Sequence, residues 1–420
     1  MDFKPYIRAH ADELLQSLAA LIRIPSVEGT PEAGAPYGRE VARCLHETLA
    51  LCERLGFPTV NMDDRVGWCE YGKGEEMIAV LGHLDVVPAG DGWNAAAPFS
   101  GEVKDGRIYG RGTMDDKGPT VAALYALAAL KDAGFIPSRR IRILFGTNEE
   151  TGCDDMAWYL AHGGETPVMG FTPDGEYPII NGEKGIMNCV YSRRLEQTGP
   201  CRLLRFEGGT AANVSPAYAM AELACPADAA ARIQASKVTV TPIEGGIRVE
   251  AQGVSVHGST PEQGENAIGR LALALTQLPL EGELADCMAF LAGRIGMETH
   301  GESLGLAMRD DLSGDLTVNL GVAAFADETL SLTLSVRYPV TKTYDGAHPR
   351  MERAFALGGF HETKMKHKAA IYMPPESELI RKLSQVYEEQ TGEKAVLKSI
   401  GGGTYAKSIP NLVAFGPIFP

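Results

Sequence analysis

The sequence predicts an α/β protein in which a doubly wound, mostly parallel sheet is interrupted by an inserted α+β domain with an antiparallel sheet and helices. Short, nearly continuous apolar runs alternate with helical stretches in the first part of the chain and again near its end. Between them, from about Gly185, strands of alternating apolar and polar residues predominate. At 420 residues the chain exceeds the size of a single hydrophobic core, so about two domains are expected.

The first part of the chain has the pattern of strands buried on both faces of a sheet. Residues 6–24 and 38–56 show the spacing of amphipathic helices, the second of which ends at Gly56. Three apolar runs are short enough to be strands and are separated by helical stretches such as residues 120–131. The runs lie at residues 77–81, 141–145 and 168–171.

The middle of the chain has a different texture. Alternation predicts half-exposed strands, and helical spacing returns at residues 264–278 and 346–356. After Pro374-Pro375, a helix at 376–391 and strands at 395–398 and 411–415 resume the first pattern. We therefore expect one domain from residues 1–184 and 374–420, and an inserted domain at 185–373. The predicted strands of the inserted domain are residues 237–241, 247–251, 316–322 and 330–336.

Composition and charge exclude several classes of function. The net charge of −15 and the absence of a Lys/Arg run argue against nucleic acid as a partner. No apolar run of 18 residues is present, which argues against a membrane span. The start of the sequence has neither the apolar region nor the small-residue cleavage site of a secretion signal, which argues against secretion. The eight cysteines are scattered without a CxxC pair, so we expect reduced thiols, none of them a metal ligand, in a cytoplasmic protein. Sequence leaves a monomer and a homodimer both open.

Acidic residues gather at the ends of the predicted strands in the first domain. The carboxyl ends of parallel strands form one crevice, where carboxylates repel one another unless a cation lies between them. Imidazole and carboxylate are donors that Zn²⁺ accepts, so the pattern predicts a metal site. We interpret the pair Asp154-Asp155 as a solvated helix start and leave it outside the site. The residues concerned are His83, Asp85, Asp115, Asp116, Glu149, Glu150 and Asp174.

Each of these motifs has a plainer interpretation when taken alone. The His83/Asp85 pair could simply end a strand, Asp115-Asp116 could begin a helix, Glu149-Glu150 could be a solvated helix start, and Asp174 could belong to an Asp-Gly turn. Several independent plain interpretations would all have to hold at successive strand ends. The combination therefore favours a metallohydrolase, in which one aspartate bridges two cations and one glutamate ligates while its neighbour transfers protons.

Four motifs, in this order, resemble those of the co-catalytic metallopeptidases that include aminoacylase, carboxypeptidase G and peptidase V. They are residues 83–88 (HLDVVP), 110–118 (GRGTMDDKG), 147–152 (TNEETG) and 171–174 (FTPD). The resemblance covers nearly the whole chain and is closest to the peptidase V-like dipeptidases. It implies a catalytic domain with an inserted lid domain.

The resemblance also implies a role for each residue. His83, Asp115, Glu150 and Asp174 would bind two Zn²⁺ ions per chain, with Mn²⁺ or Co²⁺ possible in their place, and Asp115 would bridge them. Asp85 would accept the proton of the other imidazole nitrogen of His83, and Glu149 would be the general base. The peptide bond between Asp115 and Asp116 would be cis.

Segments of the inserted domain resemble substrate-binding parts of the family. His257 would stabilise the oxyanion and Arg337 would bind the substrate carboxylate, whereas a turn histidine and a strand-edge arginine are the plainer interpretations. The glycine-rich segments at 208–213 and 401–405 resemble loops that cradle substrate. They would contribute Asn213, Gly402 and Gly403.

The expected reaction is hydrolysis of dipeptides with a free carboxylate. N-acyl-amino-acid hydrolases of the family use the same machinery, which leaves that activity as an alternative. Family members have a last metal-binding histidine shortly beyond the segment that resembles residues 411–417, and this sequence ends at Pro420. His348, His361 and His367 match no ligand position. Either the sequence is truncated or one metal has fewer protein ligands, in which case an inactive, binding homologue is a further alternative.

Overall fold

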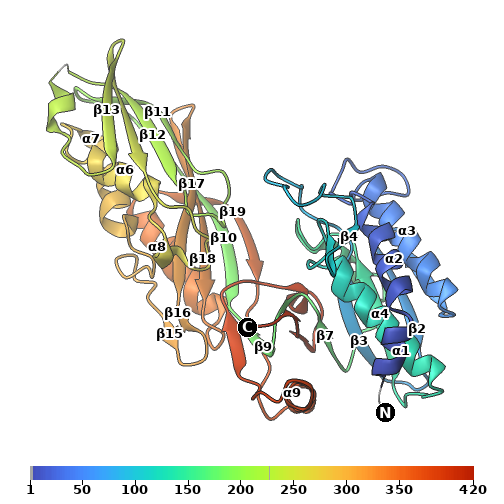
Figure 1. Cartoon of the computed structure of the whole chain (residues 1–420). Helices are drawn as coiled ribbons and strands as arrows, with labels where there is room; N and C mark the ends of the chain where they lie inside the picture. The colour runs from blue at the N-terminus through green and yellow to red at the C-terminus, as the bar shows by residue number, and fades with distance from the viewer. Residues whose placement is uncertain (1–2, 227) are drawn as a thin grey trace. The chain divides into compact units, whose positions relative to one another are not determined.

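The computed structural model describes residues 3–226 and 228–420, which form two compact units (Figure 1). The first unit comprises Met1–Asn181, Met373–Lys398 and Gly403–Pro420. The second comprises Gly182–Tyr372 and Ser399–Gly402. The fold class expected from the sequence is confirmed, because a mostly parallel sheet with helices and a separate antiparallel sheet are both present.

The larger sheet is parallel at its centre. Its strands follow the order β1-β2-β6-β3-β7-β22-β9-β20, with β21 also paired to β9. Pairing is parallel from β6 through β3 and β7 to β22, and antiparallel on either side of these four strands. The bounds are β1 Thr59–Met62, β2 Val66–Tyr71, β3 Met77–His83, β6 Arg140–Gly146, β7 Met169–Thr172, β9 Ile179–Glu183, β20 Ile371–Tyr372, β21 Leu397–Ile400 and β22 Leu412–Ala414.

Helices of the first unit bury their apolar faces on this sheet. In Figure 1, α2, α3 and α4 lie together beside β2 and β3, and one core cluster joins Leu21, Leu45 and Leu124 to Val80 and Phe145. A second cluster packs α9 on β9 and β22. The helices are α1 Lys4–Ala9, α2 Ala11–Ile22, α3 Arg39–Arg54, α4 Lys117–Asp132, α5 Asp154–Ala161 and α9 Glu378–Thr391.

The single helix expected at residues 6–24 is wrong in one respect, because it is divided into α1 and α2 at His10. The ring of His10 stacks on Tyr6, and its Nδ1 lies 2.9 Å from the carbonyl oxygen of Tyr6. A side chain that bonds to the preceding turn competes with the main-chain ladder, which explains the break.

The second unit is built on an antiparallel sheet of order β13-β14-β12-β11-β17-β18-β10-β19. Three helices, α6, α7 and α8, share one hydrophobic core with it. The strands are β10 Gly185–Arg194, β11 Arg202–Gly208, β12 Tyr218–Ala224, β13 Val238–Ile243, β14 Gly246–Gln252, β17 Thr317–Ala326, β18 Thr329–Tyr338 and β19 His361–Lys368; the helices are α6 Ala267–Leu275, α7 Gly282–Phe290 and α8 Tyr344–Leu357. Short strand pairs complete the chain: β4 Glu102–Lys104 with β5 Arg107–Tyr109, β8 Gly175–Glu176 with β23 Pro417–Ile418, and β15 Arg309–Asp310 with β16 Gly314–Asp315.

The expectation that all eight cysteines are reduced is wrong for one pair, because Cys201 and Cys225 form a disulfide. Strands β11 and β12 pair antiparallel, with Arg202 opposite Ala224, so the residues just outside this pair meet with their Cα atoms 4.4 Å apart. A separation of 24 residues gives no sign of this in the sequence. The other six cysteines are buried and take part in no disulfide among the described residues.

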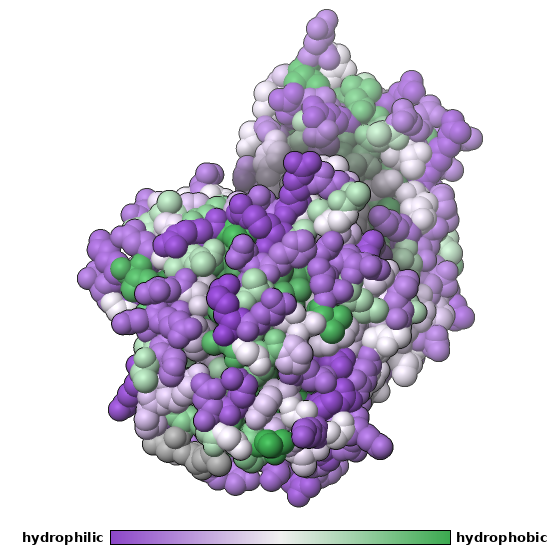
Figure 2. Space-filling model, turned by 90° about the vertical axis from the view of Figure 1, so that its right-hand side faces the viewer, coloured by the Kyte–Doolittle hydropathy of each residue, from purple (hydrophilic) through white to green (hydrophobic). Residues whose placement is uncertain are grey.

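The surface is mainly hydrophilic on the face shown in Figure 2, where hydrophobic residues lie singly or in small groups. Among the described residues, no helix is both long enough and apolar enough to cross a membrane.

Candidate metal centre and active site

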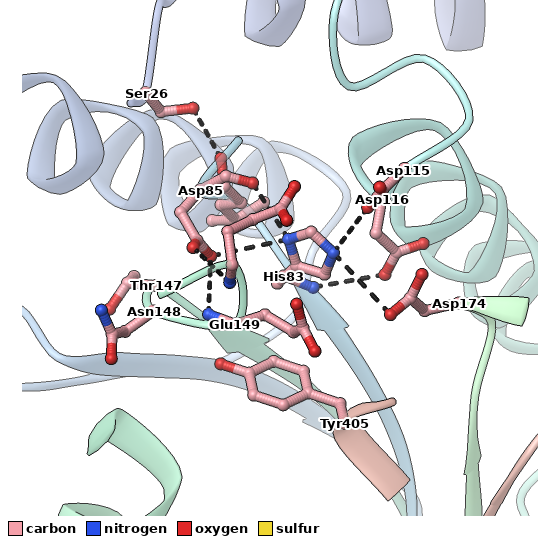
Figure 3. A network of polar contacts seen from close by, with 12 residues as sticks. Ser26, His83, Asp85, Asp115, Asp116, Thr147, Asn148, Glu149, Asp174 and Tyr405 are labelled. Atoms are coloured by element: carbon pink, nitrogen blue, oxygen red, sulfur yellow. Dashed lines mark hydrogen bonds and ion pairs between the residues drawn. The ribbon is translucent and has the colours of Figure 1, made fainter. Parts of the chain in front are cut away.

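His83 lies at the end of β3, fully buried, with both ring nitrogens facing oxygen atoms (Figure 3). Its Nδ1 is 2.9 Å from the backbone carbonyl of Asp85, so Nδ1 donates, because a carbonyl only accepts. Its Nε2 is 2.9 Å from Asp115 and 3.9 Å from Asp174. One nitrogen is thus fixed by the main chain while the other faces carboxylates, which is the arrangement of a metal-ligating histidine.

Two groups of donor atoms share this histidine. One group is His83 with Asp115 and Glu150, and the other is His83 with Glu149 and Asp174. Within each group the ligand atoms lie within 4.8 Å of one another. The structure therefore brings together all four residues assigned to metal and the glutamate assigned to proton transfer.

The buried carboxylates of this cluster disfavour one another's ionised form, and a bound positive charge would offset this effect. Burial, followed by the carboxylates of Asp174 and Asp85, raises the pKa of Glu149 to about 8, although His83 opposes the shift. Burial and the neighbouring Asp115 raise the pKa of Glu150 to about 7. Burial lowers the pKa of His83, but the nearby carboxylates of Asp115 and Asp85 outweigh this and raise it well above its ordinary value. The ligand atoms of these residues, together with the protons that their raised pKa values imply, fit a site at which divalent cations replace protons.

Asp115 and Asp116 are adjacent in the sequence, but their carboxylates contact different groups. The peptide bond between them is cis, as the resemblance implies, and Asp116 is the residue just before α4. Asp116 is fully buried and accepts hydrogen bonds from the backbone N–H of His83 and the hydroxyl of Thr120, both at 3.2 Å. Of these two aspartates, Asp115 therefore presents its carboxylate to the Nε2 of His83.

Asp85 differs from the expectation that its carboxylate accepts the proton of the His83 ring. Its Oδ1 is 3.5 Å from Nδ1, farther than the backbone carbonyl of the same residue. The carboxylate instead accepts the backbone N–H groups of Glu149 at 3.1 Å and Glu150 at 3.0 Å. Asp85 thus orients His83 through its main chain and the two glutamates through its side chain.

Asp155 is a residue of the site that the sequence did not reveal. Helix α5 does begin at Asp154, but the interpretation of the pair as solvated is wrong for Asp155, which is fully buried. Its carboxylate accepts the backbone N–H groups of Thr147 at 2.7 Å and Asn148 at 3.1 Å. An acid in the first turn of a helix is usual at a surface, so only the adjacent Glu149-Glu150 motif could have suggested this role.

The second unit contains His257, Arg337, Asn213 and Gly402, whereas Gly403 belongs to the first unit. His257 and Asn213 lie on neighbouring segments, since Gly258 donates its N–H to the carbonyl of Asn213 at 2.7 Å. The Nδ1 of His257 is 2.6 Å from the hydroxyl of Ser259, and burial and the charge of Arg337 lower the pKa of His257.

Arg337 is a buried guanidinium at the end of β18. It donates to the carbonyl of Gly401 at 2.8 Å and to the hydroxyl of Ser335 at 3.3 Å. No carboxylate among the described residues lies within 4.0 Å of it, and burial lowers its pKa to about 10. A buried cation with no counterion is suited to binding an anionic group of a ligand.

Comparison with known proteins establishes the family. Residues 79–418 match the peptidase family M20/M25/M40. The chain belongs to this family. It is therefore a hydrolase that acts on peptide bonds, and the family membership that the four motifs indicate is confirmed.

Two relatives match over nearly the full length of the chain. The protein named "Putative dipeptidase YtjP" from Bacillus subtilis (strain 168) is 37% identical, and the match covers 100% of this chain and 93% of the relative. The Beta-Ala-Xaa dipeptidase of Lactobacillus delbrueckii subsp. lactis is 35% identical, with 99% and 91% covered.

Solved structures share the fold at low sequence identity. The Saccharomyces cerevisiae dipeptidase Dug1p has a TM-score of 0.58 and 13% identity, with 99% of this chain and 92% of that chain covered. Human carnosine dipeptidase 1 has a TM-score of 0.53 and 16% identity, with 98% and 91% covered.

Proposed function

We propose that this protein is a metal-dependent dipeptidase. The observation that carries the proposal is the pair of donor groups that share His83 beside a buried glutamate of raised pKa. The relatives at 35% and 37% identity, both named as dipeptidases, support the substrate class.

His83, Asp115, Glu150 and Asp174 would hold the two cations. Zn²⁺ is the cation that suits one imidazole and several carboxylates, and Mn²⁺ or Co²⁺ could take its place. When bound, the cations act as Lewis acids that polarise the scissile carbonyl and make a water molecule a stronger nucleophile.

Glu149 would transfer the proton. Its carboxylate accepts a proton from the attacking water and then donates it to the departing amine, so that the peptide bond breaks without releasing a high-energy amide anion. Burial favours this role, because a dry carboxylate has a higher affinity for protons than one in water. The hydrogen bond from the backbone N–H of Glu149 to the carboxylate of Asp85 holds Glu149 in place.

Residues of the second unit would bind the substrate. Arg337 pairs with the free carboxylate of the dipeptide, and His257 donates a hydrogen bond to the oxyanion that develops on the scissile carbonyl. Asn213 and the backbone N–H groups of Gly402 and Gly403 would add further donors. The absence of a counterion around Arg337 among the described residues supports its assignment.

A direct assay tests this function. The purified protein is incubated with an unblocked dipeptide such as β-alanyl-alanine and, in parallel, with an N-acetyl amino acid. We expect hydrolysis of the dipeptide, its loss on chelation, and its recovery when Zn²⁺ or Mn²⁺ is added. Hydrolysis of the N-acetyl amino acid alone would instead assign the protein to the amidohydrolases of the family.

A further inference from the structure

Four consecutive backbone N–H groups at the end of β6 are shared between two buried aspartates. Thr147 and Asn148 donate to Asp155, at 2.7 and 3.1 Å. Glu149 and Glu150 donate to Asp85, at 3.1 and 3.0 Å. The main chain that delivers both glutamates to the metal centre is therefore held at every residue from 147 to 150.

Tyr405 joins the Asp155 half of this arrangement to His83. Its hydroxyl donates a hydrogen bond to the Oδ2 of Asp155, the same oxygen that accepts the N–H groups of Thr147 and Asn148. Its ring meets the ring of His83 edge to face, with centroids 6.0 Å apart and an interplanar angle of 86° (Figure 3). Tyr405, which is fully buried, thus contacts both Asp155, which holds the main chain before the glutamates, and His83.

The end of β6 is shaped to admit this ring. A Cβ atom on Gly146 would lie 2.1 Å from the Tyr405 hydroxyl oxygen and 2.4 Å from its Cε2. The carbonyl of Gly146 also accepts the N–H of Leu84, the residue after His83, at 2.9 Å. Glycine at position 146 lets the ring of Tyr405 lie against the end of β6, between His83 and residues 147–150, which we call the glutamate turn.

Burial makes the arrangement specific. A buried carboxylate is costly unless its lone pairs are satisfied, and Asp155 accepts a third backbone N–H, from Met156, at 2.7 Å. Reacting groups must be held to within about 0.5 Å of their productive positions, which requires partners that are themselves fixed. Asp155 and Tyr405 meet this requirement without presenting a ligand atom to the centre.

We propose that Asp155 and Tyr405 are positioning residues for the peptidase reaction, which together fix the main chain before Glu149 and the ring plane of His83. The inference rests on the proposed function. Tyr405 would thus hold the metal centre in place, a role separate from the substrate contacts proposed for Gly402 and Gly403 in the same segment.

Tyr405→Phe is the sharpest test, because it removes one hydroxyl and keeps the ring. We expect kcat for the dipeptide to fall about 10–100-fold with less than about a twofold change in KM, and Zn²⁺ affinity, measured by competition with a chromophoric chelator, to fall by a similar factor. Tyr125→Phe is the matched control. Tyr125 is equally buried and its hydroxyl is 3.0 Å from that of Ser17, away from the metal centre, so both readouts should stay unchanged.

Two further variants protect the test against misfolding. Asp155→Asn keeps the shape of the side chain, and Gly146→Ala displaces the ring while keeping its hydroxyl; both should show the same losses as Tyr405→Phe. A variant that only lowers the melting temperature, with wild-type kcat and Zn²⁺ affinity, would overturn the inference. If the wild-type protein hydrolyses no dipeptide, the proposed function fails, whereas the Zn²⁺ competition still decides the positioning role.

Discussion

Asp115 and Asp116 contact opposite ends of the same residue, His83. The side chain of Asp115 is 57% exposed and its carboxylate lies 2.9 Å from the ring Nε2, whereas Asp116 is fully buried and its carboxylate accepts the backbone N–H at 3.2 Å. Two adjacent acids therefore have different tasks, one toward the metal centre and one toward the protein interior.

The two aspartates should respond differently to substitution. Asp115→Asn should lower Zn²⁺ affinity by roughly 10²-fold or more, since losing a direct ligand should cost at least as much as losing an outer partner. Asp116→Ala leaves the His83 N–H and the Thr120 hydroxyl unsatisfied, and should lower the free energy of unfolding by about 1–3 kcal/mol. Metal analysis and urea unfolding of both variants measure these effects. If the two variants lost metal equally and had the same free energy of unfolding, the assignment of different tasks to Asp115 and Asp116 would be contradicted.

Glu149→Gln tests the assignment of the proton-transfer residue. We expect kcat to fall by roughly 10²–10⁴-fold while the metal content is retained, because the amide cannot accept the proton from water. Glu150→Gln is the matched control and should lose metal. The two glutamates belong to different donor groups around His83, so loss of metal from Glu149→Gln would show that Glu149 is a ligand.

The raised pKa values predict that metal binding depends on pH. Glu150, with a pKa of about 7, holds a proton near neutrality that a cation must displace in order to bind, and Glu149, with a pKa of about 8, lies close enough for the same positive charge to favour loss of its proton. Zn²⁺ affinity should therefore rise between about pH 6 and pH 8, with release of protons. Titration calorimetry in buffers of different ionisation enthalpy measures this release, and proton uptake on binding would contradict the prediction.

The same groups set the stability of the metal-free protein. In the unfolded chain both glutamates ionise near their ordinary pKa of 4.5, so above that pH the folded state binds more protons than the unfolded state. The contribution of these groups to stability is present below about pH 4.5 and is lost as pH rises toward 8. The melting temperature gained on adding Zn²⁺ should accordingly increase over that range.

Arg337→Ala tests the site for the substrate carboxylate. Because the carboxylate is charged in both ground and transition states, the change should raise KM by about 10–100-fold, as expected for a charge-assisted hydrogen bond. Kinetics on a dipeptide and its C-terminal amide separate the effects. An equal penalty on both substrates would contradict the assignment.

Sequence patterns located the candidate metal centre because apolar runs mark buried strands and the acidic motifs follow them directly. The run at 77–81 became β3, which ends at His83, and the run at 141–145 became β6, which ends just before the glutamate turn. Strand β19 escaped detection because it is a polar, mostly exposed edge strand that is held by its pairing with β10.

Contacts between distant segments could not be read from the sequence. The hydrogen bond from Tyr405 to Asp155 joins residues 250 positions apart. The sequence placed Tyr405 in a glycine-rich loop and Asp155 at a helix start, and neither pattern indicates that the two side chains meet. The use of Asp85 as an acceptor for main-chain N–H groups likewise depends on how two loops meet, which periodicity does not specify.

The central claim is that two cations, held by His83, Asp115, Glu150 and Asp174, are required for dipeptide hydrolysis. Its most direct test is a Zn²⁺ titration of the metal-stripped protein in which dipeptide hydrolysis and bound metal are measured on the same samples. We expect no hydrolysis without metal and full activity at about two ions per chain. Hydrolysis by the stripped protein, or none when the site is saturated with Zn²⁺ or Mn²⁺, would contradict the claim.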